Sequence, residues 1–492
     1  GKPVTNLQDL EQLSSNFFPP SDKKEKSTAL FKLPSWEMAG ASNVFGATKE
    51  RSASNGSLMA NDPHFELSAP SLFYLARIQL DTGGVIGASI PGTPIILSGR
   101  NKKLAWGITA SYLDDQDIFM EEQHSSNPKL YKTENGWEQF KIDRQYIKVK
   151  NSSDVEIERR WTRNGPVLPN NAFGLLSITP KNYVAALSWT ALDANDTSVS
   201  SAINLMLSQD VQSGLSALEN FYAPSLNFLL IDDKEMILKT VGKMPKRSPL
   251  NQTKGRMPSL GWKPENTWRG YWSYEVNPIT VSSPGDILGN TNNKISEKKF
   301  PKHVSYFWGD TQRISRFQKL MQNREVHTRE SFIEAQLDIV SPTARSLLPI
   351  IGSELWYTQP MGDQGSKERL RFDAVSMLAS WNGEMNEHLP EPLIYSTWMK
   401  FLQKNLIDDE LGILSKKFNH IEPIFIEKVF RDIDGASNWC DIKHSSHKET
   451  CAEISLKSLD EALLWLHDQY GKNLNALRWG DAHEAFHRHE TL

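Results

Sequence analysis

Short apolar runs separated by turn residues characterise the first half of the chain. Four of these runs predict strands, over residues 44–49, 57–60, 227–231 and 236–241. Asn55-Gly56 lies between the first two and is typical of a hairpin turn, and Asp232-Asp233 lies between the last two. The pattern therefore predicts short strands that pair in sequence order.

Apolar residues three or four positions apart predict helices, mostly later in the chain. The predicted segments are residues 211–221, 329–340, 344–351, 371–381 and 457–471. Asp210 is a suitable N-cap for the first, and Leu459, Leu463 and Leu466 fall on one side of the last. Strands at the beginning with helices interleaved favour an α+β layered sandwich.

Composition narrows the class of protein. The chain has 492 residues and is 39% hydrophobic, which suits a large packed globule. Its net charge is −4, without a long block of one sign, so a nucleic-acid partner is disfavoured. No apolar stretch approaches the roughly 18–20 residues that span a bilayer, so no transmembrane segment is expected.

The N-terminal segment indicates processing, and the two cysteines leave the redox state open. Residues 1–41 are predicted to be a linker or spacer, because residues 18–26 are charged and broken by proline. Gly1-Lys2-Pro3 is not an initiator sequence, so the chain is expected to be trimmed. Cys440 and Cys451 lie in a polar loop and are either two free thiols or a disulfide.

Ser42 is the candidate nucleophile, in the run Gly40-Ala41-Ser42-Asn43. A serine hydroxyl needs a base within hydrogen-bond reach, and the α-amine of a chain-terminal serine, with a reference pKa near 8, is one such base. This chemistry requires that the Ala41–Ser42 bond be cut. The small residues before Ser42 permit the tight turn in which its hydroxyl attacks the preceding carbonyl.

Several motifs follow Ser42 in a fixed order. They are Asn61-Asp62-Pro63-His64, Gly99-Arg100-Asn101, Trp106-Gly107-Ile108-Thr109-Ala110, Gly289-Asn290-Thr291-Asn292-Asn293, Tyr306-Phe307-Trp308-Gly309 with Arg313, and Arg478-Trp479-Gly480-Asp481-Ala482-His483. In order and spacing the chain resembles the penicillin acylase (penicillin amidase) family of N-terminal nucleophile hydrolases over nearly all of residues 40–492. The resemblance implies a four-layer αββα sandwich with helical insertions.

The resemblance assigns roles to individual residues. Ser42 matches the nucleophile, the backbone N–H of Ala110 and the side-chain amide of Asn292 match the oxyanion-hole donors, and Arg313 matches an arginine that positions the asparagine. His64 matches the position that separates branches of the family. The penicillin G branch has glutamine there, whereas the cephalosporin and acyl-homoserine-lactone branches have histidine. A histidine beside the terminal serine is expected to orient its α-amine or help to deprotonate it.

The resemblance also points to an acyl pocket and a cation site. Phe65, Leu67, Ser98 and Ile108 match the pocket, and Ser98 and Ile108 depart from the penicillin G branch in a way that favours an aliphatic acyl chain. Asp114, Gln116 and Asp117 match the stretch in which some members bind a structural calcium ion. The downstream segment 300–304 lacks the acid that a calcium shell would need and carries His303. A solvated acidic turn is the alternative.

The resulting expectation is an amidohydrolase without a required cofactor. Residues 42–492 are expected to be its catalytic-chain region, with a helical insertion at about 315–475 and with both ends truncated relative to the family. The expected substrate is an N-acylated small molecule, either an N-acyl-homoserine lactone or a β-lactam side chain, and a non-catalytic, unprocessed binding protein is the alternative. The resemblance further implies a small upstream chain from the same precursor and a periplasmic or secreted location.

Overall fold

The computed structural model describes residues 42–65, 67–81, 83–309, 311–356, 362–363, 366–418, 422–485, 487 and 489. The predicted linker 1–41, including Ala41, lies outside these residues. The chain divides into two compact units. The strand unit comprises residues up to 66, Ser71–Gly309 and Glu325–Phe332, and the helical unit comprises Leu67–Pro70, Asp310–Arg324 and Ile333–Leu492.

A seven-stranded antiparallel sheet forms the centre of the strand unit. In spatial order its strands are β17 (Ile279–Val281), β15 (Met236–Val241), β14 (Leu226–Ile231), β6 (Ala105–Ala110), β5 (Ser98–Arg100), β4 (Val85–Ser89) and β3 (Tyr74–Ile78). All residues of β14 and β15 are buried. Strands covered on both faces read as continuous apolar runs, and this explains why these two were visible in the sequence.

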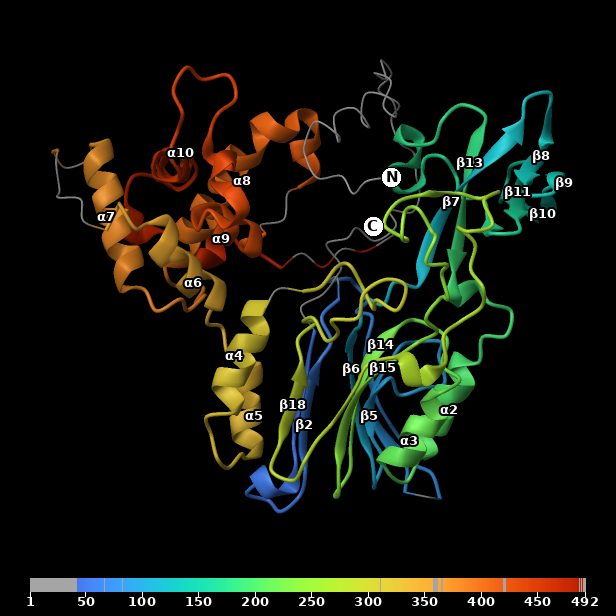
Figure 1. The fold of residues 1–492 in the computed structure, drawn as a ribbon. Helices are drawn as coiled ribbons and strands as arrows, with labels where there is room; N and C mark the ends of the chain where they lie inside the picture. Colours follow the sequence, from blue (N-terminus) through green and yellow to red (C-terminus); the bar gives the residue numbers. More distant parts are fainter. Residues whose placement is uncertain are drawn as a thin grey trace. The chain divides into compact units, whose positions relative to one another are not determined.

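Helices α2 (Ser198–Leu207) and α3 (Val211–Leu218) lie on one face of this sheet (Figure 1). Asp210 begins α3 with a capping box, because its side chain accepts from the Ser213 N–H. The layer between helices and sheet is apolar and includes Ile96, Trp106, Ile108, Leu205, Val211, Leu218, Phe228 and Leu230.

A second sheet lies on the opposite face, with β1 (Asn43–Ala47) between β18 (Ile287–Asn290) and β2 (Leu58–Asp62). Val44 packs there with Leu229, Ile231, Met236 and Leu238. Side chains alternate along β6, so Trp106 and Ile108 face the helices while Gly107 faces the second sheet. A Cβ on Gly107 would lie 2.6 Å from Cγ2 of Val44, so the close approach of the sheets requires glycine.

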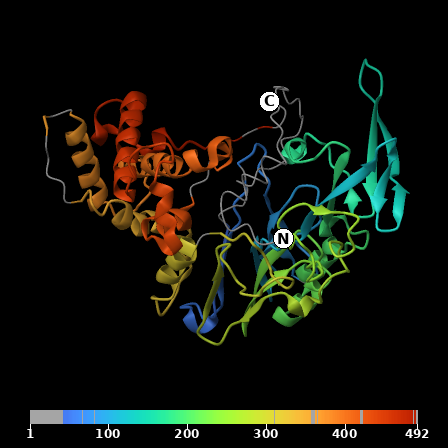
Figure 2. The same cartoon turned by 45° about the horizontal axis from the view of Figure 1, so that its top comes forward.

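Outside the second sheet, the Phe45 ring packs on Phe332 of α5 (Arg329–Gln336), with ring centroids 5.2 Å apart. The layers are therefore α2 and α3, two sheets, and the first turn of α5. Two further sheets complete the unit, and their strands β8 to β11 are drawn in cyan in Figure 2. One of these sheets contains β7 (Gln116–His124), β8 (Asn127–Thr133), β9 (Gly136–Gln139), β13 (Tyr183–Trp189) and β16 (Ser259–Leu260). The other contains β10 (Lys141–Ile147), β11 (Val155–Thr162) and β12 (Gly165–Pro166).

The helical unit packs around a separate apolar core. Its helices are α4 (Thr311–Met321), α6 (Pro342–Ile351), α7 (Lys367–Ser380), α8 (Glu391–Leu411), α9 (Pro423–Phe430) and α10 (Cys451–Tyr470). Trp398 and Leu402 of α8 are fully buried there with Leu459 of α10. Cys440 and Cys451 form a disulfide. Within the described residues, no helix is both long and apolar enough to cross a membrane.

The element predictions are confirmed in type, with shifted ends. Residues 329–340 and 344–351 became α5 and α6, 371–381 became part of α7, and 457–471 became part of α10. The hairpin turn at Asn55-Gly56 is wider than predicted, because a short 3-10 helix, Lys49–Arg51, follows β1. The sequence analysis missed α2, α4, α8 and α9.

Candidate active site

Ser42 lies immediately before β1 and is buried. Val44 of β1 pairs with Asn290 of β18 in an antiparallel register. Ser42 precedes β1 and Asn292 follows β18, so the antiparallel pairing puts both residues at the same end of this strand pair. The strand order therefore brings together the predicted nucleophile and a predicted oxyanion donor that are far apart in the sequence.

The Ser42 hydroxyl accepts a hydrogen bond from the backbone N–H of His64, with Oγ and N 3.0 Å apart. This bond uses one lone pair of the hydroxyl oxygen. The His64 ring is engaged elsewhere, since its Nε2 lies 3.1 Å from Oδ2 of Asp62. The same Asp62 oxygen accepts from Nδ2 of Asn43 at 3.1 Å. The main chain of His64 thus contacts Ser42, and the predicted role of its ring stays a prediction.

The two predicted oxyanion-hole residues are in direct contact. Nδ2 of Asn292 donates to the backbone oxygen of Ala110 at 3.0 Å, at the end of β6. Asn292 is fully buried and has a φ of 62°, a left-handed conformation that asparagine tolerates better than most residues. Its own N–H donates to Oδ1 of Asn290 at 2.9 Å.

A network of buried amide and hydroxyl side chains surrounds Asn290, which bonds to the backbone of Asn292. Oδ1 of Asn290 accepts from the Thr109 hydroxyl at 2.6 Å and from Nδ2 of Asn227 at 3.3 Å. Asn227 in turn accepts from the Thr240 hydroxyl at 2.8 Å. These bonds join β18, β6, β14 and β15 across the gap between the two sheets, so the position of Asn292 is set by four strands.

Asn61 is a positioning residue to which the sequence analysis gave no role. Its Nδ2 donates to the backbone oxygens of Asn43 and Ile108, both at 2.8 Å. Its Oδ1 accepts from the Ile108 N–H at 2.9 Å and from the Ser98 hydroxyl at 2.6 Å. One side chain therefore ties the residue after Ser42 to the strand that ends at Ala110. Its place in the Asn61-Asp62-Pro63-His64 motif was the available signal.

The four residues predicted for the acyl pocket separate into three environments. Ser98 bonds to Asn61 and so belongs to the side of the sheet that faces β1. Phe65 and Leu67 are exposed, and the Phe65 ring packs on Phe73 with centroids 5.4 Å apart. The prediction for Ile108 is wrong. Its side chain lies in the core under α2 and α3, because strand alternation points it away from the second sheet.

The predicted calcium stretch is bonded to a protein cation. The Arg247 guanidinium lies between Asp114 and Asp117, with N–O distances of 3.1 and 2.8 Å, and its side chain is 1% exposed. Gln116 contributes only its backbone oxygen, 3.3 Å from Nη2 of Arg247. No group of three or more His, Cys, Asp or Glu in the described part of the chain suits a metal ion. Asp114, Gln116 and Asp117 in this arrangement therefore do not fit a calcium shell.

Burial has the largest effect on the pKa values of Asp115 and Asp117. It raises the pKa of Asp115, beside the pair, to about 6. Burial also raises the pKa of Asp117, although the charge of Arg247 opposes that shift.

Arg313 lies on α4 in the helical unit, so its predicted action on Asn292 stays a prediction.

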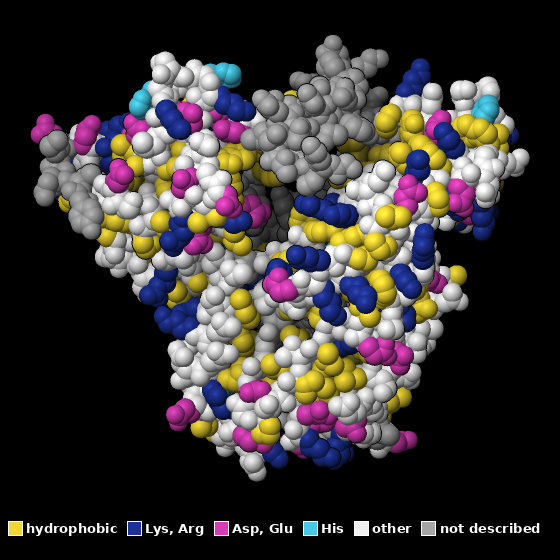
Figure 3. All heavy atoms as spheres, in the orientation of Figure 1, with side chains coloured by type: hydrophobic (Ala, Val, Ile, Leu, Met, Phe, Trp, Pro, Cys, Tyr) yellow, Lys and Arg dark blue, Asp and Glu magenta, His cyan; other side chains and the backbone are white. Residues whose placement is uncertain are grey.

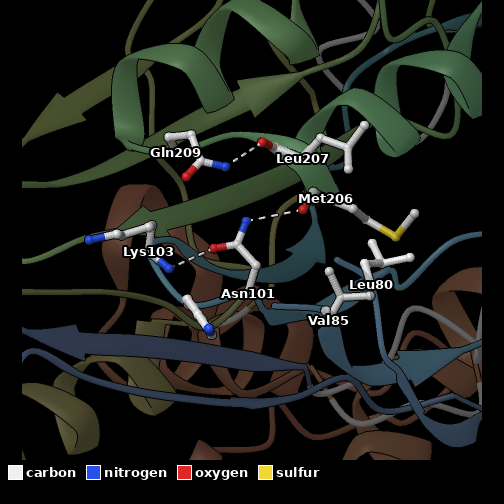
Figure 4. Close-up of a pocket in the computed structure, with 9 residues that line it drawn as sticks. Leu80, Val85, Asn101, Lys103, Met206, Leu207 and Gln209 are labelled. Carbon is white, nitrogen blue, oxygen red and sulfur yellow. Dashed lines mark hydrogen bonds between the residues drawn. The ribbon is translucent and has the colours of Figure 1, made fainter. Parts of the chain in front are cut away.

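The pocket in Figure 4 lies elsewhere in the strand unit, beside Asn101 and Met206. Nδ2 of Asn101 already donates to the Met206 oxygen at 3.0 Å. None of the residues predicted for catalysis lines this pocket. On the face drawn in Figure 3, basic and acidic side chains are interspersed.

The chain is similar to several characterised proteins. It is 25% identical over 460 residues to the acyl-homoserine lactone acylase QuiP of Pseudomonas aeruginosa, covering 90% of this chain and 54% of that protein. It is 23% identical over 464 residues to the penicillin acylase 2 proenzyme of Pseudomonas sp. SE83, covering 92% and 55% respectively. The chain thus spans about half the length of these curated relatives.

A solved structure and a family model agree with these matches. The thermostable penicillin G acylase of Alcaligenes faecalis superposes with a TM-score of 0.72 at 18% identity, covering 89% of this chain and 80% of that one. This likeness confirms the predicted N-terminal nucleophile hydrolase fold. The penicillin amidase family model matches residues 4–492. The chain belongs to the penicillin amidase family.

Proposed function

We propose that this protein is an amidohydrolase that cleaves the linear amide bond of an N-acylated small molecule through an acyl-enzyme on Ser42. The observation that carries the proposal is the meeting of three predicted groups at one corner of the sandwich. The β1–β18 pairing puts Ser42 and Asn292 at the same end of this strand pair, and Asn292 bonds to Ala110. Membership of the penicillin amidase family supports the same chemistry.

The first step of the proposed mechanism is autoproteolysis between Ala41 and Ser42. The cut gives Ser42 a free α-amine, whose reference pKa near 8 lets it accept the hydroxyl proton near neutral pH. The His64 N–H holds the oxygen during this transfer. The expected contribution of the His64 ring is to orient that amine, with Asp62 fixing the ring.

Attack on the substrate carbonyl then produces a tetrahedral oxyanion. The Ala110 N–H and the Asn292 amide are the proposed donors to it, and each such donor is worth roughly 3–4 kcal/mol of barrier. For Asn292 this requires Nδ2 to turn from the Ala110 oxygen or to share its protons between both acceptors. Release of the amine and hydrolysis of the acyl-enzyme by water complete the cycle.

N-acyl-homoserine lactones are the first substrates to test. The name of the QuiP relative favours this class, and the histidine at position 64 is the residue that both the acyl-homoserine-lactone and the cephalosporin branches carry. A β-lactam side chain is the second class, suggested by the name of the penicillin acylase 2 relative. A non-catalytic, unprocessed binding protein is the remaining alternative.

We also propose a periplasmic or secreted location and a partner chain from the same precursor. The Cys440–Cys451 disulfide supports an oxidising compartment. The greater length of the curated relatives supports further chain in the active protein.

Intact mass and N-terminal sequencing of the purified protein test the proposal. We expect a fragment that begins at Ser42 in the wild type and none in Ser42→Ala. The control is Ser54→Ala, which replaces an exposed serine between β1 and β2 and should be processed normally. A panel of N-acyl-homoserine lactones of increasing chain length and penicillin G then identifies the substrate. Processing or amide hydrolysis by Ser42→Ala would refute the mechanism, and an uncut wild type would favour the binding protein.

A further inference from the structure

Arg247 is a buried cation without a role in the proposed reaction. Its side chain is 1% exposed, and it follows β15 in the strand unit. A buried charge is costly unless it is paired and hydrogen-bonded, so such a residue persists only where its partners are fixed. Its partners lie on the connection after β6 and on the first two residues of β7.

The guanidinium donates to four oxygens of residues 114–117. Nε donates to Oδ2 of Asp117 at 2.8 Å, and Nη1 donates to the backbone oxygen of Asp114 at 3.0 Å. Nη2 donates to Oδ1 of Asp114 at 3.1 Å and to the backbone oxygen of Gln116 at 3.3 Å. Two carboxylates and two carbonyls thus converge on one positive group.

The same oxygens make up a set that a hard cation would use. Three of the four carboxylate oxygens of Asp114 and Asp117 accept from protein donors, since Oδ2 of Asp114 pairs with Nε2 of His303 at 2.7 Å. The Trp268 indole also donates to Asp117. A Cβ on Gly255 would lie 3.0 Å from Nε of Arg247, so even the adjoining backbone is fitted closely to the guanidinium.

The cluster joins the two segments that carry the predicted oxyanion donors. Asp114 follows Ala110 closely along the connection after β6, and His303 follows Asn292 along the segment after β18. Besides the Asn292–Ala110 bond, two contacts tie these segments together. They are the Asp114–His303 side-chain contact and a backbone bond from Asp114 N to Val304 O at 2.7 Å.

We propose that the Arg247 guanidinium takes the place of a metal ion at this connection. It is the permanent internal cation that fixes the loop after Ala110. Together with His303 it holds that loop to the segment after Asn292, so that the oxyanion donors are positioned without calcium. The structural part of this inference stands on the contacts of Arg247, and the positioning part rests on the proposed function.

Thermal unfolding with and without calcium tests the structural part. We expect the wild-type Tm to be the same, within about 1 °C, in millimolar calcium chloride and in EDTA, because the oxygens already face Arg247. Removing one partner of a buried ion pair is strongly destabilising, so Arg247→Met is expected to lower Tm by roughly 6–15 °C. Arg269→Met, which removes an exposed arginine from the same unit, is the matched control and should change Tm by less than about 2 °C.

Two results would overturn the structural part. One is a rise of several degrees in the wild-type Tm on adding calcium. The other is an Arg247→Met protein as stable as the Arg269→Met control. If Arg247→Met does not fold, Arg247→Lys carries the same test, since it keeps the charge but loses the planar fork that reaches four oxygens.

Steady-state kinetics of Arg247→Lys tests the positioning part. We expect kcat to fall between about 10- and 100-fold with KM within about twofold, because displaced oxyanion donors weaken transition-state binding. An unchanged kcat in a variant with a lowered Tm would refute positioning while leaving the structural part intact. If the wild type hydrolyses no amide, the proposed function fails and the calcium and stability measurements still decide the role of Arg247.

Discussion

The strand unit and the helical unit differ in the partners of their buried polar side chains. In the strand unit, Asn61 and Asn290 bond across strands and between the two sheets. In the helical unit, Thr397 and Ser458 each donate to the carbonyl four residues earlier in the same helix. The buried side chains around Asn290 therefore bond to one another across strands, whereas these hydroxyls donate to backbone oxygens. Ser455 and Gln403 also donate to backbone oxygens, on other segments of the helical unit.

The polar network of the strand unit holds side chains in fixed positions, whereas the apolar core of the helical unit mainly contributes free energy of unfolding. A fully satisfied polar network fixes its members in one arrangement, because any shift leaves a buried group unpaired. An apolar core stabilises in proportion to the area it buries and tolerates small rearrangements better. The strand unit, which carries Ser42 and Asn292, is thus expected to lose catalysis when its network is cut. The helical unit is expected to lose stability when its core is emptied.

The largest expected effect is on the helical core. Trp398 of α8 is fully buried, and its Nε1 donates to the Ser455 oxygen of α10 at 3.1 Å. Trp398→Ala is expected to cost about 3–5 kcal/mol of unfolding free energy, measured by chemical denaturation. Trp465→Ala, a partly exposed tryptophan on α10, is the control and should cost far less. Equal losses for the two variants would contradict the assigned core.

The network of the strand unit is tested at Asn292. Asn292→Ala is expected to lower kcat about 10²–10³-fold, because it removes the proposed second oxyanion donor. Alanine also strains at a φ of 62°, so Asn292→Gly is the matched variant. Glycine should lose as much kcat with a smaller loss of Tm. Substantially higher kcat in the glycine variant would assign the effect to backbone strain instead.

The disulfide tests how far the helical unit depends on a covalent restraint. Cys440 and Cys451 are separated by 11 positions, and closing a loop of this size restricts the unfolded chain by about 3 kcal/mol. Cys440→Ala with Cys451→Ala is expected to lose about that much stability in urea denaturation. A reductant should destabilise the wild type to the same level and leave the double variant unchanged. Stability of the wild type that is insensitive to reductant would contradict this restraint.

The sequence predicted elements whose pattern is local. β14 and β15 were visible as apolar runs, and α3 was visible from its cap at Asp210. The longest helix, α8, was missed because its buried residues occur on nearly all sides and leave no amphipathic period. Element type therefore follows from pattern only where one face stays polar or the run is short.

The site shows the same limit. Ser42, Ala110 and Asn292 were found through the order of motifs, and strand pairing brings them together. Arg247 was missed because its carboxylate partner Asp117 lies 130 positions away and nothing local marks the pair. The error at Ile108 was avoidable, since alternation along β6 assigns it to the face opposite Gly107.

The smallest expected effect is a pH dependence confined to the helical unit. Burial, a hydrogen bond that the protonated acid donates to the neighbouring Asp409, and the charge of that residue raise the pKa of Glu410 to about 8. A carboxyl whose pKa is higher in the folded than in the unfolded state stabilises the fold fully below the unfolded pKa, near 4.3. This contribution is lost as the pH rises through about 8. Glu410 is half-buried, so solvent screening keeps the effect small.

Glu410→Gln tests this dependence because the amide keeps the shape of the neutral acid and cannot ionise. Between pH 5 and pH 9, the unfolding free energy of the wild type is expected to fall relative to that of the variant, as measured by urea denaturation at each pH. Asp409→Asn is the companion variant. It removes the neighbouring charge, so the pKa of Glu410 in the folded state should fall, and the loss should be smaller and end at lower pH. Parallel curves for wild type and Glu410→Gln would show that Glu410 ionises alike in both states, and the helical unit would then owe its stability to its apolar core and disulfide without this carboxyl pair.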